Sequence, residues 1–236
     1  MVQKNKFLQI TKNKIIVSCQ AVDQEPLNNV EAITLVAKSV IEGGAQVLRL
    51  SQKDHIQSIQ KITKFPIIGL IKQKYQGFEV FITPTKKEID DLLELKVDCI
   101  ALDATLRKRP NNETLEELIQ YIREKSSETL LMADCSNIDD VINANRLGFD
   151  LISTTLRGYT KDTAGRSNIE NNYSFIKECL TKINVPLIAE GGFWEHDDIF
   201  NVLKLGAHSV VVGSAITRPK DITIRYFNEL EKRMKG

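Results

Sequence analysis

The sequence predicts a single α/β domain over residues 1–236, folded as a (β/α)8 barrel. Eight short apolar runs, rich in β-branched residues, alternate with longer stretches in which apolar residues recur every three or four positions. The eight units are similar in length and no GxGxxG follows the first run, which favours a closed barrel over a doubly wound open sheet. A length of 236 residues suits one such barrel.

The apolar runs are the expected strands. Parallel strands that are buried on both faces, between a packed barrel interior and an outer ring of helices, are nearly continuous apolar segments. The expected strands lie at residues 14–19, 45–50, 66–71, 97–102, 129–133, 149–153, 186–189 and 207–212. A short extra strand is expected at residues 80–83.

The segments between the strands have the period of surface helices. In ETLEELIQYIREK (113–125) the apolar residues recur at three and four, and charged residues occupy most other positions. Asn112 is expected to cap this helix. Gly43, Gly148 and Gly206 each follow a helical stretch and precede a strand, as a turn from helix to strand requires.

Composition limits the partners and the compartment. With 32 Lys+Arg against 31 Asp+Glu, no field of one sign favours nucleic acid or an anionic membrane. No stretch has the length of a signal sequence core or of a membrane span, so the expected location is the cytoplasm. The four cysteines show no metal-binding or disulfide spacing. The expected partner is a small molecule, and whether the chain forms a homodimer stays open.

Polar residues follow most of the expected strands. Barrel enzymes build their sites from the loops at the carboxyl ends of the strands, so these residues are the candidates for function. They are Gln20, Arg49, Lys72, Asp103, Asp134, Thr154, Thr155 and Glu190. Part of the pattern is structural, because any strand that leaves a core meets water. For Asp103 the structural role is favoured, through pairing with Arg107 or Arg109.

Strands seven and eight end in the glycine-rich phrases AEGG and VVGSA. Glycines let backbone amides approach a ligand closely, and barrels often bind phosphate at these two loops. The expected phosphate-binding residues are Gly191, Gly192, Gly213 and Ser214. The alternative is that the glycines only serve tight turns.

Lys72 and Glu190 are the expected acid/base groups. Lys72 follows the apolar run PIIGLI, so partial burial and the nearby Arg49 would lower the pKa of its ammonium group, and a neutral lysine can act as a base. Glu190 closes PLIAE and could exchange a proton with a substrate hydroxyl. The alternative for Lys72 is a solvated loop residue. The three histidines have no spacing suited to a shared metal, and no metal site is expected.

Nine phrases of the sequence resemble the N-acetylmannosamine-6-phosphate 2-epimerases of sialic acid catabolism, over nearly the whole chain. They are VSCQA (17–21), EGGAQVLRL (42–50), PIIGLIK (66–72), FITPTKKEID (81–90), IALDAT (100–105), LLMAD (130–134), GFDLISTTLRGYT (148–160), IAEGG (188–192) and VVGSAITRP (211–219). The resemblance implies a (β/α)8 barrel that interconverts N-acetylmannosamine 6-phosphate and N-acetylglucosamine 6-phosphate, without NAD or a required metal.

The resemblance also implies roles for individual residues. Lys72 and Glu190 become the catalytic pair. The residues around the sugar become Gln20, Arg49, Asp134 and Arg218. The phosphate falls on the amides of Gly191, Gly192, Gly213 and Ser214, in agreement with the interpretation of the strand ends.

Several positions depart from the family pattern, including Lys74 before Tyr75 and Phe193 after Gly192, and five of the departures are expected at the pocket wall, where they would affect substrate range. These five are Leu50, Ser51, Cys135, Gly192 and Ser153, the last of which replaces a glycine before Thr154. Two alternative functions remain. One is another phosphate-binding barrel enzyme, such as a ribulose-phosphate 3-epimerase or a thiamine phosphate synthase. The other is a catalytically silent sugar-phosphate sensor, which the presence of both Lys72 and Glu190 disfavours.

Overall fold

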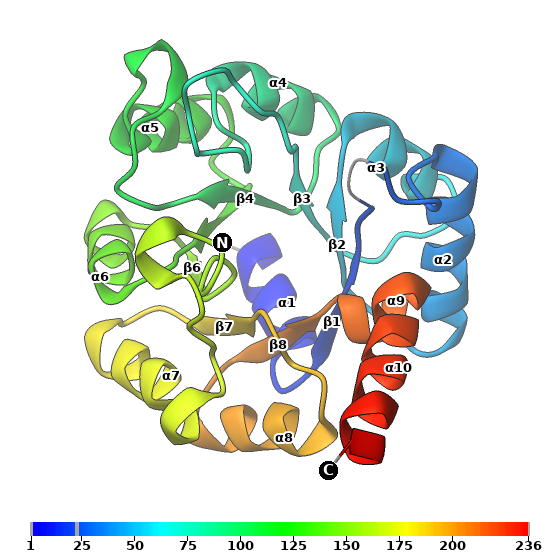
Figure 1. Ribbon diagram of the computed structural model, residues 1–236. Coiled ribbons are helices and arrows are strands. Elements are labelled where there is room, and N and C mark those ends of the chain that lie inside the picture. The colour runs from blue at the N-terminus through cyan, green and yellow to red at the C-terminus, as the bar shows by residue number, and fades with distance from the viewer. Residues whose placement is uncertain (1, 22–23, 236) are drawn as a thin grey trace.

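The computed structural model describes residues 2–21 and 24–235. Eight parallel strands close into a barrel in the order of the sequence, with β1 paired to both β2 and β8 (Figure 1). The strands are β1 (Ile15–Cys19), β2 (Leu48–Ser51), β3 (Ile67–Leu70), β4 (Cys99–Asp103), β5 (Leu130–Asp134), β6 (Leu151–Ser153), β7 (Leu187–Glu190) and β8 (Ser209–Val212). The predicted barrel is confirmed, and every strand begins and ends within three residues of its expected range.

The prediction of an extra strand at residues 80–83 is wrong. Only one isolated antiparallel bridge forms there, between Ile82 and Lys72. The bridge nevertheless ties the segment that follows β3 to the segment that precedes α4.

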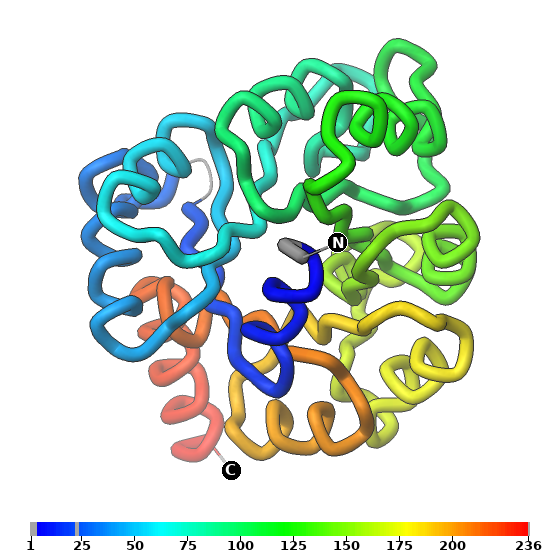
Figure 2. The backbone as a smooth tube through the Cα atoms, turned by 180° about the vertical axis from the view of Figure 1, so that it is seen from behind, coloured from blue at the N-terminus to red at the C-terminus, as the bar shows by residue number. Residues whose placement is uncertain are grey.

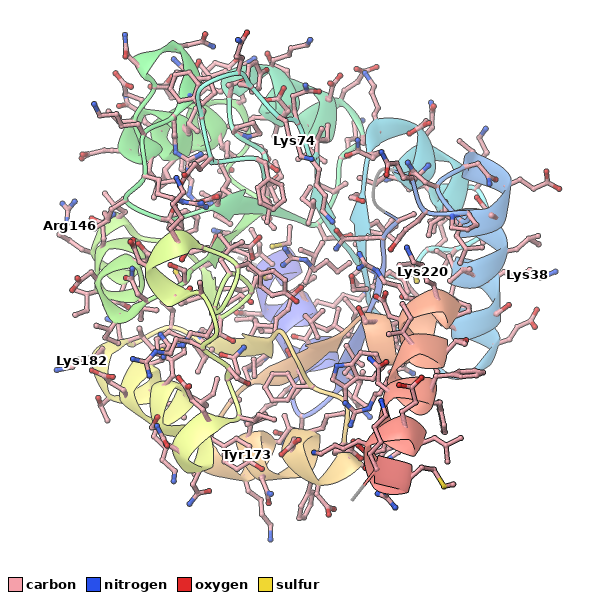
Figure 3. The ribbon with its side chains drawn as sticks, viewed as in Figure 1. Lys38, Lys74, Arg146, Tyr173, Lys182 and Lys220 are labelled. Carbon is pink, nitrogen blue, oxygen red and sulfur yellow. The ribbon has the colours of Figure 1, made fainter. Side chains whose placement is uncertain are left out.

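Helices surround the barrel. They are α2 (Val30–Glu42), α3 (Lys53–Gln60), α4 (Lys86–Glu94), α5 (Leu115–Lys125), α6 (Ile138–Leu147), α7 (Glu170–Lys182), α8 (His196–Leu205), α9 (Ser214–Thr217) and α10 (Pro219–Lys235), with short 3-10 turns at Pro110–Asn112 and Lys161–Thr163. Lys38, Arg146 and Lys182 project outward from α2, α6 and α7 (Figure 3). Among the described helices, none is both long enough and apolar enough to cross a bilayer.

The helix ends follow their local sequence, with one correction. The cap of α5 is Thr114 rather than Asn112, because Glu117 stands three residues after Thr114 and completes a capping box: the Thr114 amide donates to Glu117 Oε2 (2.8 Å) and the Glu117 amide to Thr114 Oγ1 (3.2 Å). Gly148 and Gly206 end α6 and α8 with φ of 81° and 111°, a conformation that favours glycine.

Two apolar cores lie on the two faces of the strands. The inner core fills the barrel with residues such as Ile16, Ile68 and Met132, and the outer core packs the strands against the helices. Helix α1 (Val2–Thr11) crosses the amino-terminal opening of the barrel (Figure 2), where Phe7 joins the inner core and is 2% exposed. The barrel is therefore closed at that end.

The alternation of side chains along each strand continues past the inner core. In β5 Leu130 and Met132 point inward, so Asp134 does too. In β7 the inward residue Ile188 is followed two positions later by Glu190. The polar residues at the carboxyl ends of the strands are thus directed to the barrel axis, on top of a dry core.

Candidate active site

A cavity of about 950 Å³ opens at the carboxyl ends of the strands. Nine of the ten residues expected in the site line it. They are Gln20, Arg49, Lys72, Glu190, Gly191, Gly192, Gly213, Ser214 and Arg218. The tenth, Asp134, is fully buried beside Arg49. The barrel therefore gathers residues from strand ends across the whole sequence into one site.

Arg49 is the centre of a buried ion cluster. Its Nη1 and Nη2 donate to Asp134 Oδ1 and Oδ2 at 3.0 and 2.6 Å, and Nη1 lies 2.9 Å from Glu190 Oε2. Burial alone would lower the pKa of Arg49, but the charges of Asp134 and Glu190 raise it. The guanidinium is therefore a permanent cation between two carboxyl groups.

Glu190 shares its cation with Asp134. Burial raises the pKa of Glu190 to about 7, with Arg49 opposing the rise and Asp134 adding to it. Its Oε2 lies 3.0 Å from Thr155 Oγ1. A carboxylic acid that titrates near neutrality can donate and accept protons under ordinary conditions.

Lys72 lies across the same cavity in the segment after β3. Burial, with the charges of Arg218 and Arg49, lowers the pKa of its ammonium group to about 8, while the charges of Glu190 and Glu25 oppose the change. Gln52 fixes the backbone at this point, because its side-chain oxygen accepts from the Lys72 amide (2.8 Å) and its side-chain nitrogen donates to the Lys72 carbonyl (3.3 Å). Lys72 is thus a half-buried amine on a fixed backbone.

Gln20 and Arg218 come from β1 and the α9–α10 junction. Gln20 Nε2 donates to Ser18 Oγ (3.0 Å), and Thr217 Oγ1 donates to the Ser18 carbonyl (2.7 Å). Arg218 Nη1 lies 3.5 Å from Asp221 Oδ2. The end of β1 and the end of α9 are therefore connected at the cavity wall.

The two glycine loops lie at the cavity next to each other. Gly191 and Gly192 have φ of 107° and 80°, which a side chain would strain. Asn168 holds this loop from behind, because its Nδ2 donates to the carbonyls of Glu190 (2.7 Å) and Gly191 (3.0 Å). A Cβ at Gly191 would meet the same Nδ2 at 3.1 Å. Gly213 precedes α9, whose first residue is Ser214.

The structural role expected for Asp103 is confirmed. Its Oδ1 accepts from the amide and hydroxyl of Thr105, and its Oδ2 accepts from Arg107 Nη2 at 2.7 Å. Asp103 therefore braces the loop after β4.

The expectation that all five departures form the pocket wall is wrong. Leu50 and Cys135 belong to the outer core, because they stand at outward positions of their strands. Gly192 lines the cavity, Ser153 contacts Thr155 beneath it, and Ser51 is buried without lining it. In residues 2–21 and 24–235, no three His, Cys, Asp or Glu side chains are grouped as metal ligands.

Ser18, Gln52 and Asn168 were not singled out from the sequence. Thr155 was a candidate at a strand end, but its contacts with both carboxyl groups were not predicted. Ser18 could have been found, because it stands two positions after the inner-core residue Ile16. Gln52 and Asn168 lie in loops and act through backbone atoms of distant segments. No local pattern in the sequence predicts such long-range contacts.

Comparison with known proteins agrees on one family. Residues 33–232 match a family model described as "Putative N-acetylmannosamine-6-phosphate epimerase". A Malacoplasma penetrans protein described as "Putative N-acetylmannosamine-6-phosphate 2-epimerase" is 64% identical over 225 residues, which are 95% of this chain and 97% of that protein. A Listeria monocytogenes protein of the same description is 42% identical over 228 residues, which are 97% and 96% of the two chains.

Solved structures show the same fold. The N-acetylmannosamine-6-phosphate 2-epimerase from Clostridium perfringens has a TM-score of 0.89 and 41% identity, and the match covers 94% of this chain and 95% of that one. A thiamine phosphate pyrophosphorylase from Pyrococcus furiosus has a TM-score of 0.59 at 15% identity over 92% of each chain. The second likeness concerns the barrel fold alone.

Proposed function

The chain belongs to the N-acetylmannosamine-6-phosphate epimerase family, and we propose that it interconverts N-acetylmannosamine 6-phosphate and N-acetylglucosamine 6-phosphate by inverting C2. The whole chain, residues 1–236, would be the catalytic domain. One observation carries the proposal: a lysine with a pKa lowered to about 8 and a glutamate with a pKa raised to about 7 line the same cavity. Inversion by proton removal and return needs such a base and such an acid.

The first step is opening of the sugar ring. Only beside a free aldehyde is the C2 proton acidic enough to be removed by a side chain. In the protonated form, Glu190 gives its proton to the ring oxygen and its carboxylate then accepts the proton of the O1 hydroxyl. The ring opens with no net change in the protonation of Glu190.

The second step is removal of the C2 proton by the neutral amine of Lys72. The electron pair moves into an enolate whose oxygen becomes negative. Arg49 lines the cavity and stays charged, so it supplies the positive charge that favours this enolate. The ammonium group of Lys72 then returns a proton to the opposite face of C2, which completes the inversion and restores the neutral amine.

We propose that the sugar phosphate binds at the two glycine loops. Gly191, Gly192 and Gly213 leave their backbone amides uncovered by side chains, and the Ser214 hydroxyl adds a donor beside them. Asn168 fixes the first of these loops. Backbone amides held in place can bind an anion without a lysine cluster.

A homodimer formed through α10 is also proposed. None of the described side chains of α10 is buried, and Phe227, Leu230 and Met234 are 64%, 59% and 80% exposed. Their spacing of three and four places them on one face of the helix. Helix α10 lies at the outside of the helical ring, next to α9 (Figures 1 and 2). A second copy that presents the same apolar face would cover these residues.

Lys72→Met tests the base. The change keeps most of the apolar stem and removes the amine, so kcat should fall by about 10²- to 10⁴-fold while substrate binding weakens much less. Proton NMR in deuterated water should show deuterium at C2 of both epimers with the natural protein, and label uptake in the variant should fall with kcat. Lys72→Arg is the control, because it keeps the charge but cannot act as a base. A folded Lys72→Met protein that retains more than about a tenth of the natural kcat contradicts this role.

The pH dependence of kcat/KM tests the assignment of Lys72 as the base and Glu190 as the acid. Lys72 must be neutral, so the rate falls as the pH drops below about 8, and Glu190 must be protonated, so the rate falls as the pH rises above about 7. The profile should be a bell with its maximum between these values. Glu190→Gln should lose the alkaline limb and keep the acid limb. An alkaline limb that persists in the residual activity of Glu190→Gln would show that another group is the acid.

Ser214→Ala tests the phosphate site. Loss of the hydroxyl donor should raise KM for N-acetylmannosamine 6-phosphate, because charge-assisted hydrogen bonds contribute about 1.5–3 kcal/mol. Unphosphorylated N-acetylmannosamine should be a much poorer substrate of the natural protein, and its kcat/KM should not change in the variant. Equal kcat/KM for the two sugars would rule out the phosphate assignment.

A charged α10 tests the dimer. Sedimentation equilibrium should give twice the chain mass for the natural protein and the chain mass for Phe227→Glu combined with Leu230→Glu. Asn228→Glu combined with Lys232→Gln is the matched control, because it changes the net charge equally on the other side of the helix. A natural protein that stays a monomer, or a control pair that dissociates equally, contradicts the proposed interface.

A further inference from the structure

The hydroxyl group of Thr155 lies between the two carboxyl groups of the site. Its Oγ1 is 2.8 Å from Asp134 Oδ1 and 3.0 Å from Glu190 Oε2. The hydroxyl oxygen of Ser153 lies 2.8 Å from the same Thr155 atom. Asp134 and Ser153 are fully buried. Three oxygen atoms thus surround one hydroxyl at the wall of the cavity, which Thr155 and Glu190 both line.

The number of hydrogen atoms available to these contacts shows how many protons Asp134 and Glu190 carry. Each short contact between two oxygens needs one hydrogen between them, since otherwise lone pairs face each other. The three contacts need three hydrogens, while Thr155 and Ser153 supply one each, and the longer approach of Ser153 Oγ to Glu190 Oε2 (3.5 Å) brings no further hydrogen. The third must come from a carboxyl group. Asp134 and Glu190 therefore hold one proton between them.

The surrounding charges assign that proton to Glu190. Both oxygens of Asp134 accept from the guanidinium of Arg49, which favours its carboxylate form. The charged groups that face Glu190 are Arg49 from β2, Lys72 after β3 and Asp134 from β5. The two cations, and a hydrogen bond from Thr155 when its hydroxyl donates, favour the Glu190 carboxylate, but burial and the charge of Asp134 outweigh them and raise its pKa to about 7.

We propose that Thr155 is a positioning residue that keeps the proton on Glu190, by accepting a hydrogen bond from the Glu190 carboxyl group while donating its own to Asp134. The proposal deepens the role of Glu190 as the acid and rests on that proposed function. If Thr155 donated to Glu190 instead, it would lower the pKa of Glu190 and leave its contact with Asp134 without a hydrogen. After Glu190 gives its proton to the sugar, rotation of the Thr155 hydroxyl toward Glu190 stabilises the new carboxylate, while Asp134 keeps both bonds to Arg49.

Infrared spectroscopy of the whole protein tests the arrangement without substrate. The natural protein should show the carbonyl stretch of a protonated carboxyl group that is absent in Glu190→Gln and disappears as the pH rises through about 7. Thr155→Val keeps the shape but removes the acceptor, so this stretch should move to higher frequency or vanish. Ser153→Ala is the matched control. It removes the Ser153 hydrogen together with the contact to Thr155 and the longer approach to Glu190 Oε2 (3.5 Å), so the two remaining contacts of Thr155 still require a proton on Glu190 and the stretch should remain.

Kinetics separates positioning from structure. Thr155→Val should lower kcat by at least about tenfold with KM changed less than about threefold, and Thr155→Ser should restore kcat. A stretch that Thr155→Val leaves unchanged, or a natural protein without a Glu190 stretch, overturns the proposal. If the stretch behaves as expected while kcat of both Thr155→Val and Glu190→Gln stays natural, the hydrogen-bond arrangement stands and the acid role of Glu190 fails instead.

Discussion

Both carboxyl groups of the site, Asp134 and Glu190, contact the guanidinium of Arg49, and the chemistry of the cavity depends on this sharing of one positive charge by two acids. Burial of a charge costs several kcal/mol unless a partner compensates it, and removal of one partner of a buried pair costs about 3–5 kcal/mol. Arg49 compensates one negative charge, that of Asp134, through two hydrogen bonds. A second negative charge on Glu190 would be left without full compensation. Retention of a proton on Glu190 removes that excess charge.

The positive charge of Arg49 also lowers the pKa of Lys72, the proposed base. Arg49 and Arg218 lower the pKa of Lys72 that burial has already lowered, so the amine loses its proton more readily than a surface lysine. The positive charge that makes Lys72 a base is also the charge that favours an enolate beside it. One fixed arginine on a barrel strand thus affects the acid, the base and the intermediate. Because β2 is paired on both sides within the closed barrel, Arg49 has little freedom to move away from any of them.

The barrel was predicted from short, nearly continuous apolar runs, and the candidate site residues were predicted from the polar residues at the ends of those runs and from the family resemblance. Apolar residues at every second position of β5 and β7 direct Asp134 and Glu190 inward, and a closed barrel then brings them together. The dual contact of Thr155 was not predicted, because it depends on the separation of two other strand ends. The hold of Gln52 on the backbone at Lys72 joins a loop to a segment twenty residues away, and no periodic pattern encodes it.

The alternation also decides which departures from the family pattern can reach the chemistry. Leu50 follows Arg49 by one position, so it faces the outer core and cannot contact a ligand in the cavity. Cys135 follows Asp134 in the same way. Ser153 has the opposite orientation, and its hydroxyl contacts Thr155 at 2.8 Å. A glycine there would remove the contact with Thr155, the longer approach to Glu190 Oε2 (3.5 Å) and the hydroxyl hydrogen. The serine therefore leaves the proton count at Glu190 unchanged, which explains how this substitution is compatible with the same acid.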